Sequence, residues 1–253
     1  MATLRAGLLA AGVVAGIILP ASGLANGPVM LQVFTEARST TVASYRLAHY
    51  LKQTGCQARL VFEAVPDADL TFRAAGSTPG SAPALQAVNR NGRNPVPVWV
   101  TRKTSGVNSL VELEGREVSL IAGNDPVGGR LALQALAEHG VKPARGQRYE
   151  AGDFSSALGL LLHNNTHAAA SELGLVTPFL ENQGLAITWQ GQPVTGAGWY
   201  TGPDTALSAR ITDCLAALGA LKRSDDRQIF QIFPEWVSGF AAPESQPNKE
   251  TSR

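Results

Sequence analysis

The sequence predicts an α/β protein with mainly parallel sheets covered by helices. Short apolar segments rich in branched residues alternate with amphipathic segments along nearly the whole chain, which is typical of strands followed by helices. Glycines stand where the two clearest helical segments stop, at Gly55 and Gly140. The 253 residues, of which 44% are hydrophobic, suit one large domain or two lobes of ordinary size.

The first 25 residues have the pattern of a signal peptide. Arg5 is the charged start, residues 7–19 are an apolar run, and Pro20 ends that run. Gly23-Leu24-Ala25 places small residues where a signal peptidase reads, so we expect cleavage after Ala25 and export of the rest. The apolar run is shorter than the roughly 20 residues that a membrane helix needs.

The balance of charged residues bears on which partners the protein can have. The chain has 21 Lys and Arg against 20 Asp and Glu, without a basic stripe. A nucleic acid or an anionic membrane surface is therefore not expected as a partner.

The first part of the chain is expected to contain four strands and two helices. Residues 30–34, 58–62, 68–72 and 97–101 are compact apolar runs, as strands require. Residues 42–54 carry apolar side chains on one helical face, and 84–88 is predicted as a brief helix. Residues 103–108 are polar and contain Gly106, which fits a crossing between lobes.

The most informative stretch is 109–140. A buried strand over 118–122 leads through the loop 123–130 into an amphipathic helix that ends before Gly140. Backbone N–H groups at such a helix start can hold an anion, although an ordinary strand-to-helix turn explains the pattern at least as well.

Helices are expected over 154–163, 171–183, 205–221 and 226–233, with Pro178 interrupting the second. Strands are expected over 147–150, 166–170 and 185–189, with an aromatic-bearing segment at 197–201. The polar end, 241–253, is expected to be disordered.

The two cysteines have two explanations. Cys56 follows the first helix and Cys214 lies in the last long one. Export permits a disulfide between them, and two separate buried thiols are the alternative.

Candidate ligand-binding residues stand at strand ends and helix starts, where ligands gather in α/β folds. Several also have a plainer explanation, such as helix capping for Ser39 and Thr40 or core packing for Trp199 and Tyr200. The candidates are Glu36, Arg38, Ser39, Thr40, Arg73, Asn124, Gly128, Gly129, Arg130, Ser171, Trp199 and Tyr200.

Catalysis and metal binding are not indicated. We find no G-x-S-x-G, H-E-x-x-H or phosphate-loop motif, and no cysteine–histidine pair in a recognisable context. His163 and His167 are four residues apart, but Asn164-Asn165 should end the helix between them. We therefore expect no enzyme, no metal site and no cofactor.

The order of elements resembles the periplasmic solute-binding proteins of ABC importers, and within them the phosphate/phosphonate-binding (PhnD-like) family. The resemblance is carried by LQVF with the following turn and helix, by SLVELEGREVSLIAG, and by QPVTGAGWY before the helix 205–221. It implies a two-lobed periplasmic-binding-protein type II fold with a hinge between the lobes. Lobe one would comprise 26–102 and 203–240, and lobe two 103–202.

The resemblance implies a monomer in the periplasm that clamps a small molecule and delivers it to a membrane transporter permease or a receptor. Two departures alter the expected ligand. Val127-Gly128-Gly129-Arg130 replaces the Ser-Thr-Ser-Gly run of phosphonate binders, and Gly152-Asp153-Phe154 lacks the histidine that this family tends to carry. An oxyanion is costly to bury without such donors, so we expect a more apolar or carboxylate ligand. The alternative function is an accessory or sensor protein on the same fold that signals to a membrane partner without transport.

Overall fold

The computed structural model describes residues 27–35, 37, 39–74, 82–123, 125–202, 205 and 207–243. The predicted signal peptide and its cleavage site lie outside the described residues, as does the predicted tail from 244 onward. In the part of the chain that is described, no helix is long and apolar enough to cross a membrane.

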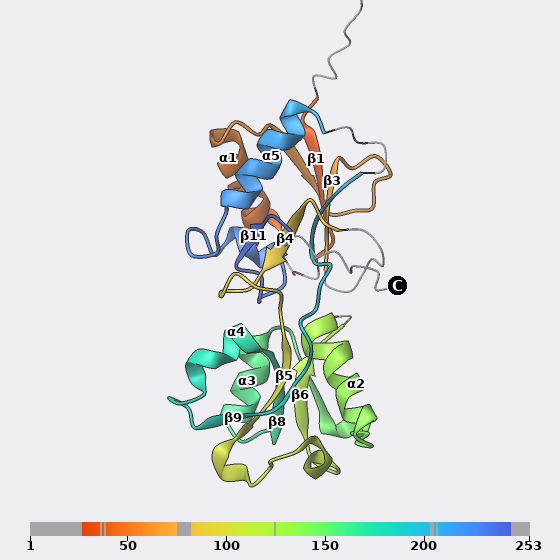
Figure 1. Ribbon diagram of the computed structural model, residues 1–253, viewed down its shortest axis with the longest axis vertical. Helices are drawn as coiled ribbons and strands as arrows, with labels where there is room; N and C mark the ends of the chain where they lie inside the picture. Colours follow the sequence, from red (N-terminus) through yellow and green to blue (C-terminus); the bar gives the residue numbers. More distant parts are fainter. Residues whose placement is uncertain are drawn as a thin grey trace, which may run out of the picture.

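The structure has two lobes, one above the other along the long axis (Figure 1). The sheet of lobe one has the strand order β11-β4-β10-β3-β1-β2. Its strands are β1 (Val29–Val33), β2 (Ala58–Val61), β3 (Leu70–Arg73), β4 (Leu85–Val88), β10 (Gly198–Thr201) and β11 (Gly239–Ala241). Its helices are α1 (Thr41–Gln53), α5 (Ala209–Ala220) and the 3-10 turn η6 (Ile229–Ile232).

Lobe two is built around a second sheet with the order β7-β6-β8-β5-β9. The strands are β5 (Pro97–Arg102), β6 (Val118–Ile121), β7 (Arg148–Ala151), β8 (Ala168–Glu172) and β9 (Leu185–Gln190). The α-helices are α2 (Leu131–Glu138), α3 (Phe154–Leu162) and α4 (Leu173–Val176). Short turns complete the lobe: η1 (Lys103–Ser105), η2 (Leu110–Leu113), η3 (Pro126–Arg130), η4 (Arg145–Gln147) and η5 (Thr177–Phe179).

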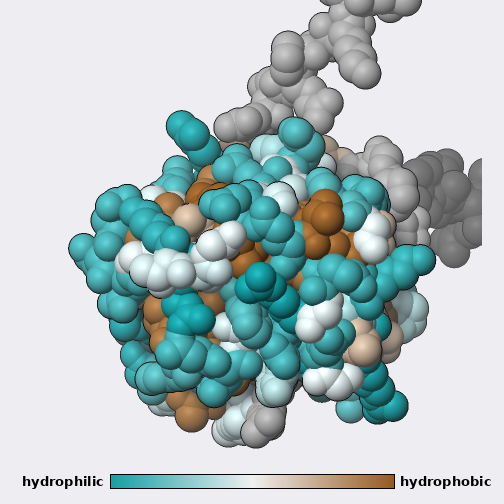
Figure 2. Space-filling view, turned by 90° about the horizontal axis from the view of Figure 1, so that it is seen from below, coloured by the Kyte–Doolittle hydropathy of each residue, from teal (hydrophilic) through white to brown (hydrophobic). Residues whose placement is uncertain are grey.

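Helices cover both faces of the second sheet, as predicted. Alternate residues of a strand point to opposite faces, so Trp99 of β5 packs in one cluster with Ala132 and Leu136 of α2. Its neighbour Val98 packs in another cluster with Leu161 of α3. The end of this lobe, seen from below, is mostly hydrophilic, with separate small hydrophobic groups (Figure 2).

The sheets are mixed rather than mainly parallel. β1 pairs parallel with β2 and β3, and β6 pairs parallel with β7 and β8. The pairs made by β4, β5, β9, β10 and β11 are antiparallel. The antiparallel strands are those that flank the passage of the chain between lobes or close the first sheet, where no crossover helix intervenes.

Four predicted elements differ from those observed. In place of the helix over 171–183, residues 171–172 end β8, and the helical part is only α4 with η5. The brief helix over 84–88 is strand β4, because the segment fits between β10 and β11. The helix over 226–233 is reduced to the short 3-10 turn η6. Residues 239–241 form strand β11, so the first residue of the predicted tail is ordered.

The predicted lobe boundaries would separate strands that pair with each other in the same sheet. The predicted division places β5 in lobe one, but β5 pairs with β8 and β9, and it places β10 in lobe two, but β10 pairs with β3 and β4. Hydrogen bonding therefore places the passages between lobes at 89–96 and 191–197.

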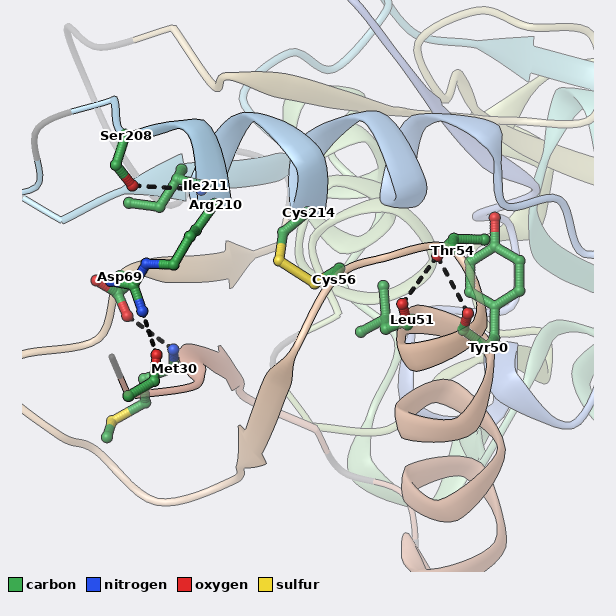
Figure 3. Close-up of a disulfide and its surroundings, with 11 residues drawn as sticks. Met30, Tyr50, Leu51, Thr54, Cys56, Asp69, Ser208, Arg210, Ile211 and Cys214 are labelled. Carbon is green, nitrogen blue, oxygen red and sulfur yellow. Dashed lines mark hydrogen bonds between the residues drawn. A yellow bond between two sulfur atoms is a disulfide. The ribbon is translucent and has the colours of Figure 1, made fainter. Parts of the chain in front are cut away.

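Lobe one is closed by a disulfide between Cys56 and Cys214, whose Cα atoms are 4.8 Å apart (Figure 3). Of the two explanations for the cysteines, the disulfide is the one observed. Cys56 lies just beyond the end of α1 and Cys214 in the middle of α5, and both are buried. The bridge joins residues 158 positions apart in sequence, with all of lobe two between them.

Candidate functional site

In the loop after β6, an aspartate side chain accepts hydrogen bonds from the backbone of the same loop. Asp125 immediately precedes the π-helical turn η3, which leads into α2. Its Oδ1 accepts hydrogen bonds from the backbone N–H groups of Val127 (3.0 Å) and Gly128 (2.6 Å). Such N–H groups are the donors that would otherwise hold an anion. In this chain Asp125 already supplies a negative oxygen to them.

Gly128 and Gly129 lie where the surroundings are too tightly packed for a side chain. A Cβ on Gly128 would lie 2.4 Å from Cγ1 of Ile121 and 2.5 Å from Cε1 of Phe154. A Cβ on Gly129 would lie 2.9 Å from the carbonyl oxygen of Ile121. Both glycines are buried, whereas Arg130 is exposed. Close packing explains the two glycines, and an anion-binding role of all three residues stays a prediction.

The start of α3 is capped by two carboxylates, one of them from lobe one. Asp153, next to the helix, accepts a hydrogen bond from the N–H of Ser156 at 2.6 Å. Glu235, which lies between η6 and β11, accepts from the N–H groups of Phe154 (2.6 Å) and Ser155 (3.1 Å). The Ser155 hydroxyl donates to Oε1 of Glu235 at 2.5 Å, while both N–H groups donate to Oε2. The first free N–H groups of α3 are therefore all occupied by oxygen atoms of the protein.

Arg223 holds the segment that carries Glu235. Its guanidinium donates to the carbonyl oxygens of Val237 (2.6 Å), Pro234 (3.0 Å) and Phe230 (3.3 Å) and lies over the Phe230 ring. Burial lowers the pKa of Arg223 to about 10, while the negative charge of Glu235 acts in the opposite direction. The guanidinium still carries its charge at neutral pH, so the segment is fixed by a half-buried cation.

Apolar side chains continue from one lobe into the other beside these polar contacts. Ile121, Val127 and Phe154 of lobe two belong to the same cluster of buried side chains as Trp236 and Val237 of lobe one. Phe154 is 3% exposed and Trp236 is 1% exposed, so neither side chain offers surface to water in this arrangement.

The passage between the lobes is organised by a buried carboxylate. Glu172 is fully buried at the end of β8. Its Oε1 accepts from the side chain of Asn89 (2.8 Å) and the N–H of Val96 (3.2 Å), and its Oε2 accepts from the N–H of Leu175 (3.0 Å). Glu172 thus ties both ends of the segment 89–96 to lobe two.

The predicted aromatic candidates lie within lobe one. Trp199 is fully buried in β10 and packs edge to face with Phe72 and Phe233 at 5.7 and 5.9 Å between ring centroids. Tyr200 donates to the carbonyl oxygen of Gly196 at 2.8 Å, and burial raises its pKa despite the Arg73 guanidinium 4.9 Å from its ring. Trp199 therefore has the environment of a core residue, as its plainer explanation predicts. Contact of these three candidates with a ligand stays a prediction.

The other candidates are dispersed. Ser39 is exposed and Thr40 immediately precedes α1, where its side chain makes no capping hydrogen bond. Ser171 is buried in β8 opposite Val98. Glu36, Arg38 and Asn124 lie outside the described residues. Within the described ranges, no group of three His, Cys, Asp or Glu side chains could hold a metal ion.

Sequence reasoning missed the carboxylates that organise the space between the lobes. Asp153 carried a local signal, because an aspartate directly before an apolar helix is a typical N-cap. Glu235 carried none, since Phe154 and Ser155 are 81 and 80 residues away in sequence. Glu172 has a local role as the cap of α4, but its bond to Asn89 spans 83 residues and has no local signal.

Two sheets in separate lobes, two passages between them and helix starts at their junction are the arrangement of the two-lobed periplasmic-binding-protein fold. The family described as "ABC transporter, phosphonate, periplasmic substrate-binding protein" matches residues 68–246, and the chain belongs to it. Proteins of this family work in the periplasm, bind a small molecule and deliver it to a membrane permease.

Solved structures share the fold at low sequence identity. A binding protein of an ABC phosphonate transporter from Pseudomonas aeruginosa is 16% identical, with a TM-score of 0.52 over 85% of this chain and 82% of that one. PhnD1 from Prochlorococcus marinus, in complex with methylphosphonate, is 18% identical, with a TM-score of 0.55 over 87% and 94%. XAC2383 from Xanthomonas citri, bound to ATP, is 15% identical, with a TM-score of 0.57 over 85% and 91%. No curated protein matches the chain.

Proposed function

We propose that this protein is a monomeric, non-catalytic solute-binding protein whose ligand is not a phosphonate. It is exported after cleavage behind Ala25, takes up a small molecule between its lobes and presents it to a transporter permease. The ligand favours the closed arrangement by making contacts with both lobes.

The altered ligand is supported by the occupied helix starts of lobe two. Asp125 fills the N–H groups of η3, and Glu235 and Asp153 fill those of α3. A phosphonate would have to displace these carboxylates or lie beside them, and like charges at such short range repel. An uncharged, more apolar solute meets no such cost. The repulsion between charges therefore favours an apolar ligand over the carboxylate that the sequence also allowed.

A thermal-shift panel tests the proposal. Methylphosphonate, phosphate and sulfate are compared with neutral apolar solutes and with mono- and dicarboxylates, each at 1 mM and at one ionic strength. A ligand at about 100 times its Kd stabilises the folded state by about 2.7 kcal/mol, which raises the melting temperature by several degrees. A rise with methylphosphonate, matched by a micromolar Kd in calorimetry, would refute the altered specificity.

The alternative of a sensor or accessory protein is favoured by one observation, the contact of Glu235 with α3, because it joins the lobes without any solute. Such a protein would bind no member of the panel and would co-purify with a membrane partner. A solute from the panel that binds with micromolar Kd and enters cells only in the presence of this protein would exclude the alternative.

A further inference from the structure

We propose that Glu235 fastens lobe one to lobe two and keeps the lobes together without a solute. The inference concerns the protein's own contacts and does not depend on which ligand it carries. We call the three hydrogen bonds between Glu235 and the residues Phe154 and Ser155 the Glu235 contact.

First, the residues of the Glu235 contact lie in different lobes. Glu235 precedes β11, which pairs with β4 in the sheet of lobe one. Phe154 and Ser155 begin α3, which packs on β8 and β6 in lobe two. Every bond of the Glu235 contact therefore crosses between the lobes.

The second step is the chemistry of the pairing. A helix start carries partial positive charge on its free N–H groups, and a carboxylate is the side chain that matches it best. Asp153 serves only the N–H of Ser156, and its backbone carbonyl oxygen serves that of Ala157. The N–H groups of Phe154 and Ser155 are left for Glu235, so the cap of α3 is divided between the two lobes.

The third step is the rigidity of the segment that presents Glu235. Arg223 binds three carbonyl oxygens on either side of it, at Phe230, Pro234 and Val237. Because the segment is already fixed, little conformational entropy is lost when the carboxylate meets α3.

The fourth step is the apolar contact next to the carboxylate. Trp236, directly after Glu235, is buried in the cluster that also contains Phe154 and Ile121 of lobe two. Charge-assisted hydrogen bonds are stronger where neighbouring apolar groups exclude water. Separation of the lobes would expose the buried side chains of Trp236 and Phe154, whereas Ser155 is exposed already.

The test uses the full mature chain without added solute. Glu235→Gln and Glu235→Ala are compared with the wild type by small-angle scattering and by amide hydrogen exchange. We expect a larger radius of gyration, and exchange at Phe154 and Ser155 that is faster by roughly tenfold or more, as the loss of a hydrogen bond to a charged group implies. Trp236 should become accessible to iodide quenching.

Glu181→Gln is the matched control, because it removes an exposed glutamate whose ion pair with Lys103 (3.0 Å) lies within lobe two. It should leave the radius of gyration and the exchange at Phe154 and Ser155 unchanged. Ser155→Ala removes only the hydroxyl side of the Glu235 contact and should give a smaller effect in the same direction.

Wild-type values of both quantities in folded Glu235→Gln and Glu235→Ala would overturn the proposal. If neither variant folds, Ser155→Ala decides alone: a wild-type radius of gyration together with wild-type exchange would overturn it. A solute-dependent change in the wild type bears on the proposed function and leaves this outcome unaffected.

Discussion

Removal of the disulfide should destabilise the protein by about as much as a large-to-small substitution in the core. Cys56 and Cys214 close a loop whose ends are 158 residues apart. The chain-entropy relation for a loop of this length gives a loss of about 5 kcal/mol in the free energy of unfolding, and native disulfides typically contribute about 2–5 kcal/mol. The effect arises in the unfolded chain, which has more conformational entropy without the cross-link. Both cysteines are buried, and their neighbours stay packed in the folded state.

The measurement is urea unfolding of Cys56→Ala/Cys214→Ala against the wild type, followed by tryptophan fluorescence. We expect the free energy of unfolding to fall by about 3–5 kcal/mol. Dithiothreitol should lower the wild type by a similar amount and leave the double variant unchanged. A double variant within about 1 kcal/mol of the wild type would refute the loop-closure reasoning.

Three further substitutions test individual features. Trp199→Ala should lower the free energy of unfolding by about 3–5 kcal/mol in urea, because it leaves a cavity in the aromatic core, and a loss below about 1 kcal/mol would contradict that core role. Gly128→Ala should cost about 1–3 kcal/mol, since the new methyl group meets Ile121 Cγ1 at 2.4 Å, and an unchanged melting temperature would count against close packing there. A hydrogen bond from Arg46 lowers the pKa of Asp226, so the ionised carboxyl contributes stability above the unfolded pKa of about 3.9 and loses it as the pH falls through the folded pKa. The difference in melting temperature between wild type and Asp226→Asn should therefore be constant above about pH 5 and shrink as the pH falls below about 3.9, and a difference that stays constant down to about pH 2 would exclude this origin.

Local signals predicted most of the elements because the residues that form them also carry the pattern. Apolar spacing located α1 and α3, and Gly55 and Gly140 have positive φ angles of 88° and 79° just beyond α1 and α2, as a helix end favours. Residues 85–88 gave a short apolar run that fits a strand or a buried helical turn equally well, and only its pairing with β10 and β11 decides between them.

The arrangement of the site was less accessible, because it depends on residues distant in sequence. The loop 123–130 lies between a strand and a helix, as predicted, and Asp125 directly before Pro126 carries a local capping signal, but the packing around the loop does not follow from the sequence. Gly128 and Gly129 are predicted to offer backbone N–H groups to a ligand, whereas the structure shows that the side chains of Ile121 and Phe154 require the space at Gly128. Glu235 is the extreme case, since it acts on a helix of the other lobe.

The two passages between the lobes also bear on how such a protein can change over evolutionary time. The chain leaves the first sheet after β4 and returns at β10, and the passages run side by side, with the N–H of Val194 donating to the carbonyl oxygen of Pro95 at 2.9 Å. The second lobe is thus a continuous insertion with neighbouring ends, the arrangement in which whole domains are exchanged most easily. A new lobe could be grafted at this seam without rearranging the strands of its host. The grafted lobe would need a helix start at the position where Glu235 binds the N–H groups of α3.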